Sequence, residues 1–179
     1  MKLISGGVTG PKGFMASGVA CGIKKGNKKD LALISCIKPA KSAGVFTTNL
    51  VKGHSLILTM ENIKNDTTKA ILINSGNANA CIGSKDDEDT KRIASSVAKT
   101  IGCNPSEVLL GSTGVIGVPL NVDIIEKGIK DAYKNLSVTG GHTASEAILT
   151  TDTKTKEYCV EFEINDKKIK IGGMAKGSG

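Results

Sequence analysis

The amino-acid sequence predicts an α/β domain in which extended segments come first along the chain and the main helices follow. Two observations predict this class: aliphatic runs of strand length recur through the first part of the chain, and two long patterns of helical period come after them. The length of 179 residues fits one domain, 1–179. Strands are expected at 31–37, 43–49, 55–60, 69–74 and 108–110, with a further short strand within 16–24.

The strand at 31–37 is the clearest, because its aliphatic run has no polar alternation and so indicates burial on both faces. The helix at 86–101 has apolar residues at helical spacing, acidic residues in its first turn and Gly102 after its last turn. The helix at 119–136 repeats this pattern, with Pro119 near its start. Each helix therefore has one apolar face with which to cover a sheet.

The last part of the chain is expected to hold a short helix and a hairpin. Thr143 and Glu146 have the spacing of a capping box, which predicts a helix that continues to Leu149. From 158 to 171, apolar and polar residues alternate on both sides of 165–166, an Asn-Asp pair typical of a hairpin turn.

The formal net charge of +7 would suit a nucleic-acid partner, because phosphate contacts need basic residues. The lysines, however, are scattered or stand in isolated pairs, no aromatic residues interleave with them, and 85–89 sets acid beside base. A solvated surface rich in lysine is therefore expected, with a basic nucleic-acid-binding domain as an alternative. No apolar run approaches the roughly 20 residues that cross a bilayer, so a membrane is not expected as a partner.

The five cysteines contain no Cys-x-x-Cys pair and are odd in number. This usage is typical of a reducing compartment, so a cytoplasmic location is expected. The two histidines, His54 and His142, lie far apart without a helical His or Glu partner. No metal site is expected from them.

Glycines recur at every third position in 111–117, directly after the run at 108–110. The spacing lacks the Lys-Ser/Thr of a P-loop and the Gly-x-Gly-x-x-Gly of a dinucleotide site. A strand that ends in such a turn points several backbone N–H groups at one small volume, which suits an oxyanion formed only in a transition state. The same glycines could supply positive φ to a tight turn, or hold an anion without chemistry. The residues alone leave these interpretations open.

Asparagines stand at 74, 77 and 79, at and just after the end of the candidate strand 69–74. Their amides could bind polar groups of a ligand, or bond to nearby backbone as turn residues do. The turn interpretation is favoured by the general preference of asparagine for turns.

No residue of the chain stands out as a nucleophile for acyl transfer. Neither histidine lies in a Gly-x-Ser-x-Gly elbow, and a cysteine paired with one of them has no better support. Acyl transfer can also use an N-terminal threonine whose own amine is the base, but this chain begins with Met1. A precursor that is cut close downstream of these residues is therefore expected.

Six segments carry a family resemblance over the whole length of the chain. They are 11–14, 43–49, 74–80, 112–117, 149–153 and 175–179. In this order they resemble the α chain of the ornithine acetyltransferase family. Its members are glutamate N-acetyltransferases that often act also as amino-acid N-acetyltransferases. They mature by cutting themselves before a threonine. The resemblance implies an α/β sandwich, related in mechanism to the N-terminal-nucleophile enzymes, which a second (β) chain completes.

The resemblance also implies an activity and partners. An acetyl group moves from N2-acetyl-L-ornithine to L-glutamate, in arginine biosynthesis, through an acetyl-threonine intermediate. No cofactor is implied, although acetyl-CoA can serve as a further acetyl donor in the family. The β chain of the same precursor carries the threonine nucleophile, and an α2β2 heterotetramer is implied, active only when both chains are present.

Four residues match functional positions of the family. Thr113 and Gly114, in Ser-Thr-Gly-Val-Ile-Gly, are implied to stabilise the oxyanion. Thr150 and Lys176 are implied to bind substrate. A lysine suits this role because both substrates carry an α-carboxylate, although composition alone would make Lys176 one more surface lysine. The neighbouring threonines of 150–153 leave open which of them contacts the substrate.

The sequence departs from the family pattern at one point. The family's cleavage threonine lies several residues beyond an Ala-Lys-Gly-Ser-Gly segment, and here that segment is 175–179. The nucleophile and the β-chain side of the pocket are therefore expected outside these residues.

Overall fold

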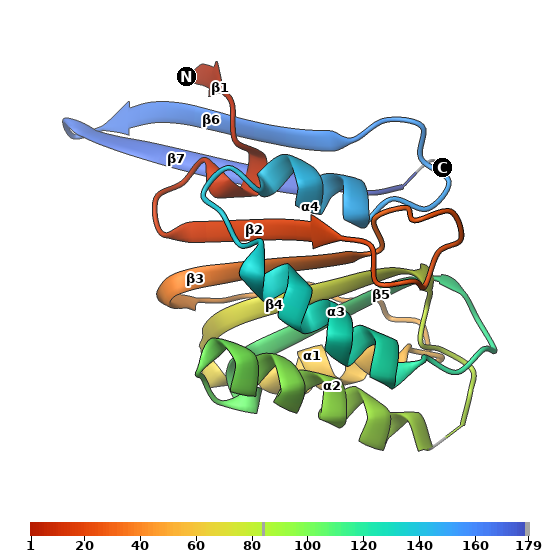
Figure 1. The fold of residues 1–179 in the computed structure, drawn as a ribbon. Helices are drawn as coiled ribbons and strands as arrows, with labels where there is room; N and C mark the ends of the chain where they lie inside the picture. Colours follow the sequence, from red (N-terminus) through yellow and green to blue (C-terminus); the bar gives the residue numbers. More distant parts are fainter. Residues whose placement is uncertain (84, 178–179) are drawn as a thin grey trace.

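The computed structural model describes residues 1–83 and 85–177, which form stacked layers of helices and sheets (Figure 1). The larger sheet has the strand order β2-β3-β4-β5: β2 (Phe14–Val19), β3 (Leu31–Lys41), β4 (Thr67–Asn77) and β5 (Val108–Val115). The smaller sheet has the order β1-β6-β7: β1 (Lys2–Ile4), β6 (Lys156–Ile164) and β7 (Lys167–Ala175). The helices are α1 (His54–Asn62), α2 (Lys85–Ile101), α3 (Val122–Lys134) and α4 (Gly141–Ala147), and short 3-10 turns lie at Gly7–Thr9, Ile63–Asn65 and Pro105–Glu107.

In the larger sheet, β2, β3 and β4 are antiparallel neighbours, whereas β5 runs parallel to β4. A parallel pair needs a crossover connection, and α2 supplies it. Helices α1, α2 and α3 cover one face of this sheet, where aliphatic side chains form the main core. Its fully buried members include Leu31, Leu33, Val97, Val108, Ile125 and Ile129.

Helix α4 lies on the opposite face, between the two sheets (Figure 1). Ala144, Ala147 and Ile148 pack there against Ala16 and Ile34 of the larger sheet. These side chains are mostly small, so the helix approaches the strands closely. The fold is thus α/β, as expected, with helices on both faces of the larger sheet.

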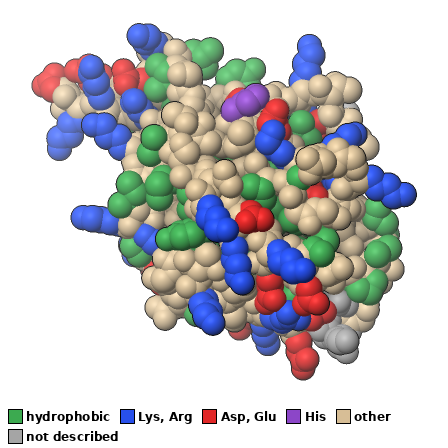
Figure 2. All heavy atoms as spheres, viewed as in Figure 1, with side chains coloured by type: hydrophobic (Ala, Val, Ile, Leu, Met, Phe, Trp, Pro, Cys, Tyr) green, Lys and Arg blue, Asp and Glu red, His purple; other side chains and the backbone are tan. Residues whose placement is uncertain are grey.

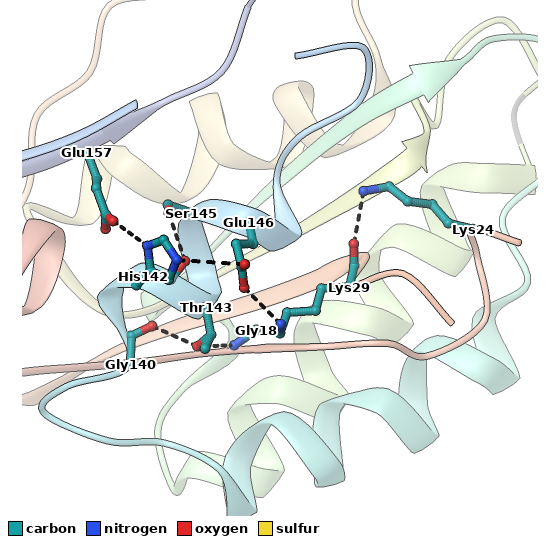
Figure 3. A network of polar contacts seen from close by, with 9 residues as sticks. All are labelled: Gly18, Lys24, Lys29, Gly140, His142, Thr143, Ser145, Glu146 and Glu157. Carbon is teal, nitrogen blue, oxygen red and sulfur yellow. Dashed lines mark hydrogen bonds and ion pairs between the residues drawn. The ribbon is translucent and has the colours of Figure 1, made fainter. Parts of the chain in front are cut away.

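Polar side chains fasten α4 to its neighbours (Figure 3). Thr143 Oγ1 accepts the N–H of Gly18 on β2 at 3.1 Å. His142 Nδ1 lies 2.5 Å from Oε1 of Glu157 on β6, and this hydrogen bond raises the pKa of the imidazole. The smaller sheet is therefore held against α4 by hydrogen bonds as well as by packing.

Several expected elements are confirmed. They are the helices at 86–101 and 119–136, the strands at 31–37 and 69–74, and the hairpin that turns at 165–166. The short strand within 16–24 is β2, which begins at Phe14 and ends at Val19.

Two expected strands are wrong. The run at 55–60 lies within α1. The prediction failed because so short an apolar run has no period that distinguishes a strand from a half-buried helix. As a helix it packs on β5 and buries Ser55 and Leu58. The segment 43–49 forms no regular element, and Val45 within it is 99% exposed, so a strand there would bury little.

The capping box expected at Thr143 is also wrong. Helix α4 begins at Gly141, and the Thr143 hydroxyl donates to the carbonyl of Gly140 at 2.9 Å. No pattern in the sequence predicted strand β1. It is extended because it pairs with β6, which lies near the other end of the chain.

The surface agrees with the expectation of dispersed charge. Figure 2 shows Lys and Arg side chains spread over this face, with acidic side chains between them. All five cysteines are free. Among the described residues, no helix combines the length and the apolar character that crossing a bilayer requires.

The pair of His142 and Glu157 is expected to stabilise the fold in a pH-dependent way. The folded-state pKa of His142 is raised above its usual value of 6.5, so the contribution is fully present below that value and is lost as pH rises through the folded-state pKa. His142→Gln should therefore lower the thermal unfolding midpoint more at about pH 5.5 than at about pH 9. Calorimetry of the complete protein measures this, with Glu163→Gln on the same strand as the control. An equal loss at both pH values would contradict the pairing.

Candidate functional site

The candidate site begins where the parallel strands β4 and β5 end side by side. In their register Asn74 lies opposite Ser112, Ser75 opposite Thr113, and Gly76 opposite Gly114. The carboxyl ends of parallel strands are a common place for ligand sites, because loops and side chains converge there. The two sequence segments singled out above are thus neighbours in space.

The backbones of Gly76 and Gly114 approach too closely for any side chain. Gly114 has a φ of +137°, and a Cβ on it would stand 2.3 Å from the carbonyl carbon of Gly76. Gly76 has a φ of +105°, and a Cβ there would stand 2.9 Å from Ile23 Cγ2. Gly114 must be glycine for space and for conformation, because backbone stands in the way of a Cβ. At Gly76 the positive φ is the reason for glycine.

The turn expected directly after Leu110 is wrong. Strand β5 continues to Val115, because its pairing with β4 extends through the glycine-containing part. The N–H of Gly117 is also committed, since it donates to the carbonyl of Ala80 at 2.8 Å. The N–H of Gly117 therefore does not belong to the expected cluster of backbone donors, and Gly114 lies within the paired part of the strand.

The asparagines after β4 are buried and bonded within the protein. Asn74 Nδ2 donates to the carbonyl of Asn77 at 2.9 Å, and Asn77 Nδ2 donates to the carbonyl of Val118 at 2.8 Å. Asn79 Nδ2 reaches Thr90 Oγ1 on α2 at 2.9 Å. The bond from Asn74 to Asn77 supports the turn interpretation for Asn74. Asn77 Nδ2 instead bonds to backbone 41 positions away, and Asn79 links the segment to the helices.

Lys176 brings three of the expected site residues together. Its Nζ donates to Thr113 Oγ1 at 2.8 Å and to Thr150 Oγ1 at 3.2 Å. Thr113 belongs to β5, Thr150 follows α4, and Lys176 follows β7, so three separate parts of the chain meet. Gly114, the fourth, is the next residue after Thr113. Thr113 is half-buried, and the other three are exposed.

The direction of these hydrogen bonds has a chemical consequence. An ammonium group only donates, so each threonine oxygen is the acceptor and keeps its own O–H for another partner. The ammonium also polarises both hydroxyls, which makes them stronger donors. The site therefore offers the hydroxyl hydrogens of Thr113 and Thr150 to a group with negative charge.

Asp152, which the sequence analysis did not single out, joins the same region. Its Oδ1 accepts the N–H of Gly177 at 2.7 Å and a hydrogen bond from Lys156 Nζ. These bonds hold the pKa of the Asp152 carboxyl at about 2, with the Lys156 contact as the larger cause. Its place in the segment 149–153, two positions after Thr150, was the sequence signal that could have identified it.

A cavity of about 670 Å³ opens beside Thr150 and Asp152. One wall is the loop between β2 and β3, whose lysines were expected to be only a solvated surface. Lining residues from this loop are Ile23, Lys24, Lys25, Asn27, Lys28 and Lys29. Lys24 Nζ donates to the carbonyl of Leu149 at 2.6 Å. Figure 3 shows its second bond, to the carbonyl of Lys29 at 2.9 Å, and Lys29 Nζ at 2.8 Å from Glu146 Oε2. In the sequence these lysines stand out only as two closely spaced pairs. The fold shows that they line the cavity.

Buried Asp30 fixes this lysine loop. Its carboxylate accepts the N–H groups of Cys21 at 2.7 Å, Gly22 at 3.2 Å and Lys24 at 2.9 Å. Burial also lowers the pKa of Lys24. Within residues 1–83 and 85–177, no group of three or more His, Cys, Asp and Glu side chains could hold a metal ion. The charged part of the cavity wall thus consists of lysines from this loop, with the carboxylates of Glu146 and Asp152 on the other side.

Comparisons with known proteins agree with this geometry. Residues 15–179 match the model of the ArgJ family. The arginine biosynthesis bifunctional protein ArgJ of Caldanaerobacter subterraneus subsp. tengcongensis is 50% identical over 179 residues, covering 100% of this chain and 44% of that protein. The protein of the same name from Bacillus anthracis is 48% identical, covering 99% of this chain and 44% of that one. The chain therefore spans less than half the length of these curated relatives.

Two solved structures share the fold over nearly the whole chain. The crystal structure of an arginine biosynthesis bifunctional protein from Bacillus halodurans has a TM-score of 0.92 and 39% identity, covering 99% of this chain and 94% of that one. The crystal structure of an ornithine acetyltransferase complexed with ornithine, from Mycobacterium tuberculosis, has a TM-score of 0.93 and 37% identity, covering 99% and 95%.

Replacing Gly114 with alanine is expected to destabilise the protein strongly. The new Cβ would meet the Gly76 backbone, and the φ of +137° strains any other residue, so the free energy of unfolding should fall. A loss of about 2 to 5 kcal/mol is expected from strain and overpacking together. Denaturant unfolding measures it, with Gly173→Ala as the control because a Cβ there meets nothing within 4 Å. Near-native stability of Gly114→Ala would contradict the close approach.

Proposed function

The chain belongs to the ArgJ family, and from that premise we propose that it is the α-chain part of an acetyltransferase of arginine biosynthesis. The donor is N2-acetyl-L-ornithine and the acceptor is L-glutamate, with acetyl-CoA as a further donor. Residues 1–179 form one domain of a precursor that cuts itself, and the protein works in the cytoplasm as an α2β2 assembly.

The lengths of the relatives support a second chain. Curated relatives are more than twice as long as this chain, since it covers 44% of them. The solved chains, by contrast, are almost its own length, since it covers 94% and 95% of them. Cleavage of a longer precursor accounts for both lengths. In this proposal the remaining part begins with the threonine nucleophile.

The contact of Lys176 with both threonines is the observation that carries the proposal. The ammonium of Lys176 lies 2.8 Å from the Thr113 hydroxyl oxygen, and Gly114 is the next residue of the chain. In the first half-reaction, the threonine oxygen of the second chain attacks the acetyl carbonyl, whose oxygen becomes an anion. The Thr113 O–H and the Gly114 N–H donate to that anion, which lowers the barrier because the donors are already in place.

Atoms balance over the two half-reactions. The acetyl C–N bond breaks, and ornithine leaves with the proton that the threonine hydroxyl has passed to the amine of the second chain. The glutamate amine then attacks the acetyl ester and the C–O bond breaks. The proton that the glutamate amine loses passes through the amine of the second chain to the threonine oxygen. Both substrates have an α-carboxylate. Lys176 has three N–H donors, of which the threonines take two, so the third is free to bind this carboxylate.

Acetyl transfer by the complete protein tests the proposal. Incubation with N-acetylornithine alone should add one acetyl group to the chain that begins with threonine, as seen by intact mass. Addition of glutamate should remove that group and yield N-acetylglutamate. If the complete protein forms no acetylated chain and no N-acetylglutamate, the proposal fails.

Lys176→Ala is expected to weaken both half-reactions. A charge-assisted hydrogen bond contributes roughly 1.5 to 3 kcal/mol, so kcat/KM should fall at least about tenfold for donor and acceptor alike. Lys176→Gln should restore little, because it lacks the charge. Steady-state kinetics with each substrate varied in turn measure this, with Lys168→Ala on the same hairpin as the control. A loss for only one substrate would show that Lys176 does not bind the shared carboxylate.

A further inference from the structure

We propose that Asp152 is the positioning residue of this site: it holds the backbone at Gly177 so that the ammonium of Lys176 lies between Thr113 and Thr150. The inference rests on the proposed function, since it gives Asp152 a part in what Lys176 does. Asp152 acts through Lys176 and does not itself touch the substrate.

One carboxylate oxygen of Asp152 makes both of its side-chain contacts. Oδ1 accepts the N–H of Gly177 at 2.7 Å and the hydrogen bond from Lys156 Nζ. Oδ2 is buried without a hydrogen-bond partner among the described residues, and the side chain is 0% exposed. An unsatisfied buried oxygen is unfavourable, so this conformation is explained by what Oδ1 holds together.

Lys176 needs such a support because it lies beyond the end of β7. The strand ends at Ala175, and both Lys176 and Gly177 are exposed. A lysine side chain has many rotamers, so its ammonium stays in one place only when the backbone is held. The N–H of Gly177 bonds to Asp152 and so ties this segment to the connection between α4 and β6.

The same residue also fixes the other side of the contact. Asp152 follows Thr150 by two positions, on the connection between α4 and β6. Its carboxylate therefore joins the loop that bears one hydroxyl to the segment that bears the ammonium. Such fixed geometry is worth much in catalysis, because a shift of about 1 Å can cost on the order of a hundredfold in rate.

Position, and not charge, is what Asp152 contributes. The ammonium of Lys156 contacts the same oxygen that accepts from Gly177, so it compensates the negative charge locally. Two variants separate these effects. Asp152→Asn keeps the shape and an oxygen acceptor but removes the charge, whereas Asp152→Glu keeps the charge but moves the carboxylate by one carbon.

The test is a double-mutant cycle on the complete protein. Asp152→Ala and Asp152→Glu should each lower kcat/KM by roughly tenfold or more, and Asp152→Asn should keep most of the activity. In a Lys176→Ala background, the Asp152 variants should change kcat/KM by less than about twofold, because there is no longer an ammonium to position. Asp131→Ala, at a surface aspartate 3.7 Å from Lys134, is the matched control.

Amide hydrogen exchange supplies a readout that does not depend on activity. Asp152→Ala should speed exchange of the Gly177 N–H and leave the β7 amides unchanged. Unchanged exchange of the Gly177 N–H overturns the proposal. So does a double-mutant cycle in which the Asp152 and Lys176 substitutions lower kcat/KM independently. An Asp152→Asn variant that loses as much kcat/KM as Asp152→Glu also overturns it. Should Lys176→Ala keep wild-type activity, the role of Lys176 in the proposed function fails, and the exchange result then decides the tether by itself. Asp152→Glu serves for both measurements where Asp152→Ala does not fold.

Discussion

The contact between the backbones of Gly76 and Gly114 is the constraint on which the site depends. It exists because β4 and β5 are parallel neighbours, and that arrangement requires the crossover through α2. The crossover in turn supplies the apolar helix faces that bury the main core. The same register that packs the core therefore sets Thr113 beside Gly114 at the end of the sheet.

The other half of the site comes from the smaller sheet, which explains the importance of α4. This helix packs on the larger sheet through small apolar residues and is hydrogen-bonded to β6 through His142 and Glu157. Helix α4 therefore connects the two sheets, and Lys176, which follows β7 of the smaller sheet, contacts Thr113 of the larger one. Gly114, Thr150 and Lys176 are exposed, so the proposed second chain would have to cover them, because oxyanion donors act most strongly away from water.

The period of apolar residues was sufficient to predict those helices and strands in which the pattern repeats over many residues. The helices at 86–101 and 119–136 and the final hairpin are long enough for their period to identify them. The run at 55–60 was misread because six residues contain too little period, and burial on β5 decided its form. The extension of β5 through Gly114 could not be read either, since glycine in a turn and glycine in a close backbone contact look alike in sequence.

The site residues show why composition was not sufficient. Lys176 lies 63 positions from Thr113 and 26 positions from Thr150, the two threonines that it joins. None of the three differs in type from other polar residues of the sequence. The family resemblance named them, and the geometry gives the physical reason. An ammonium that donates to two hydroxyl oxygens leaves both O–H groups free, so both hydroxyls can donate to a negatively charged group. A lysine with a flexible stem can do this only if its backbone is held, which is why the buried carboxylate of Asp152 belongs to the same argument.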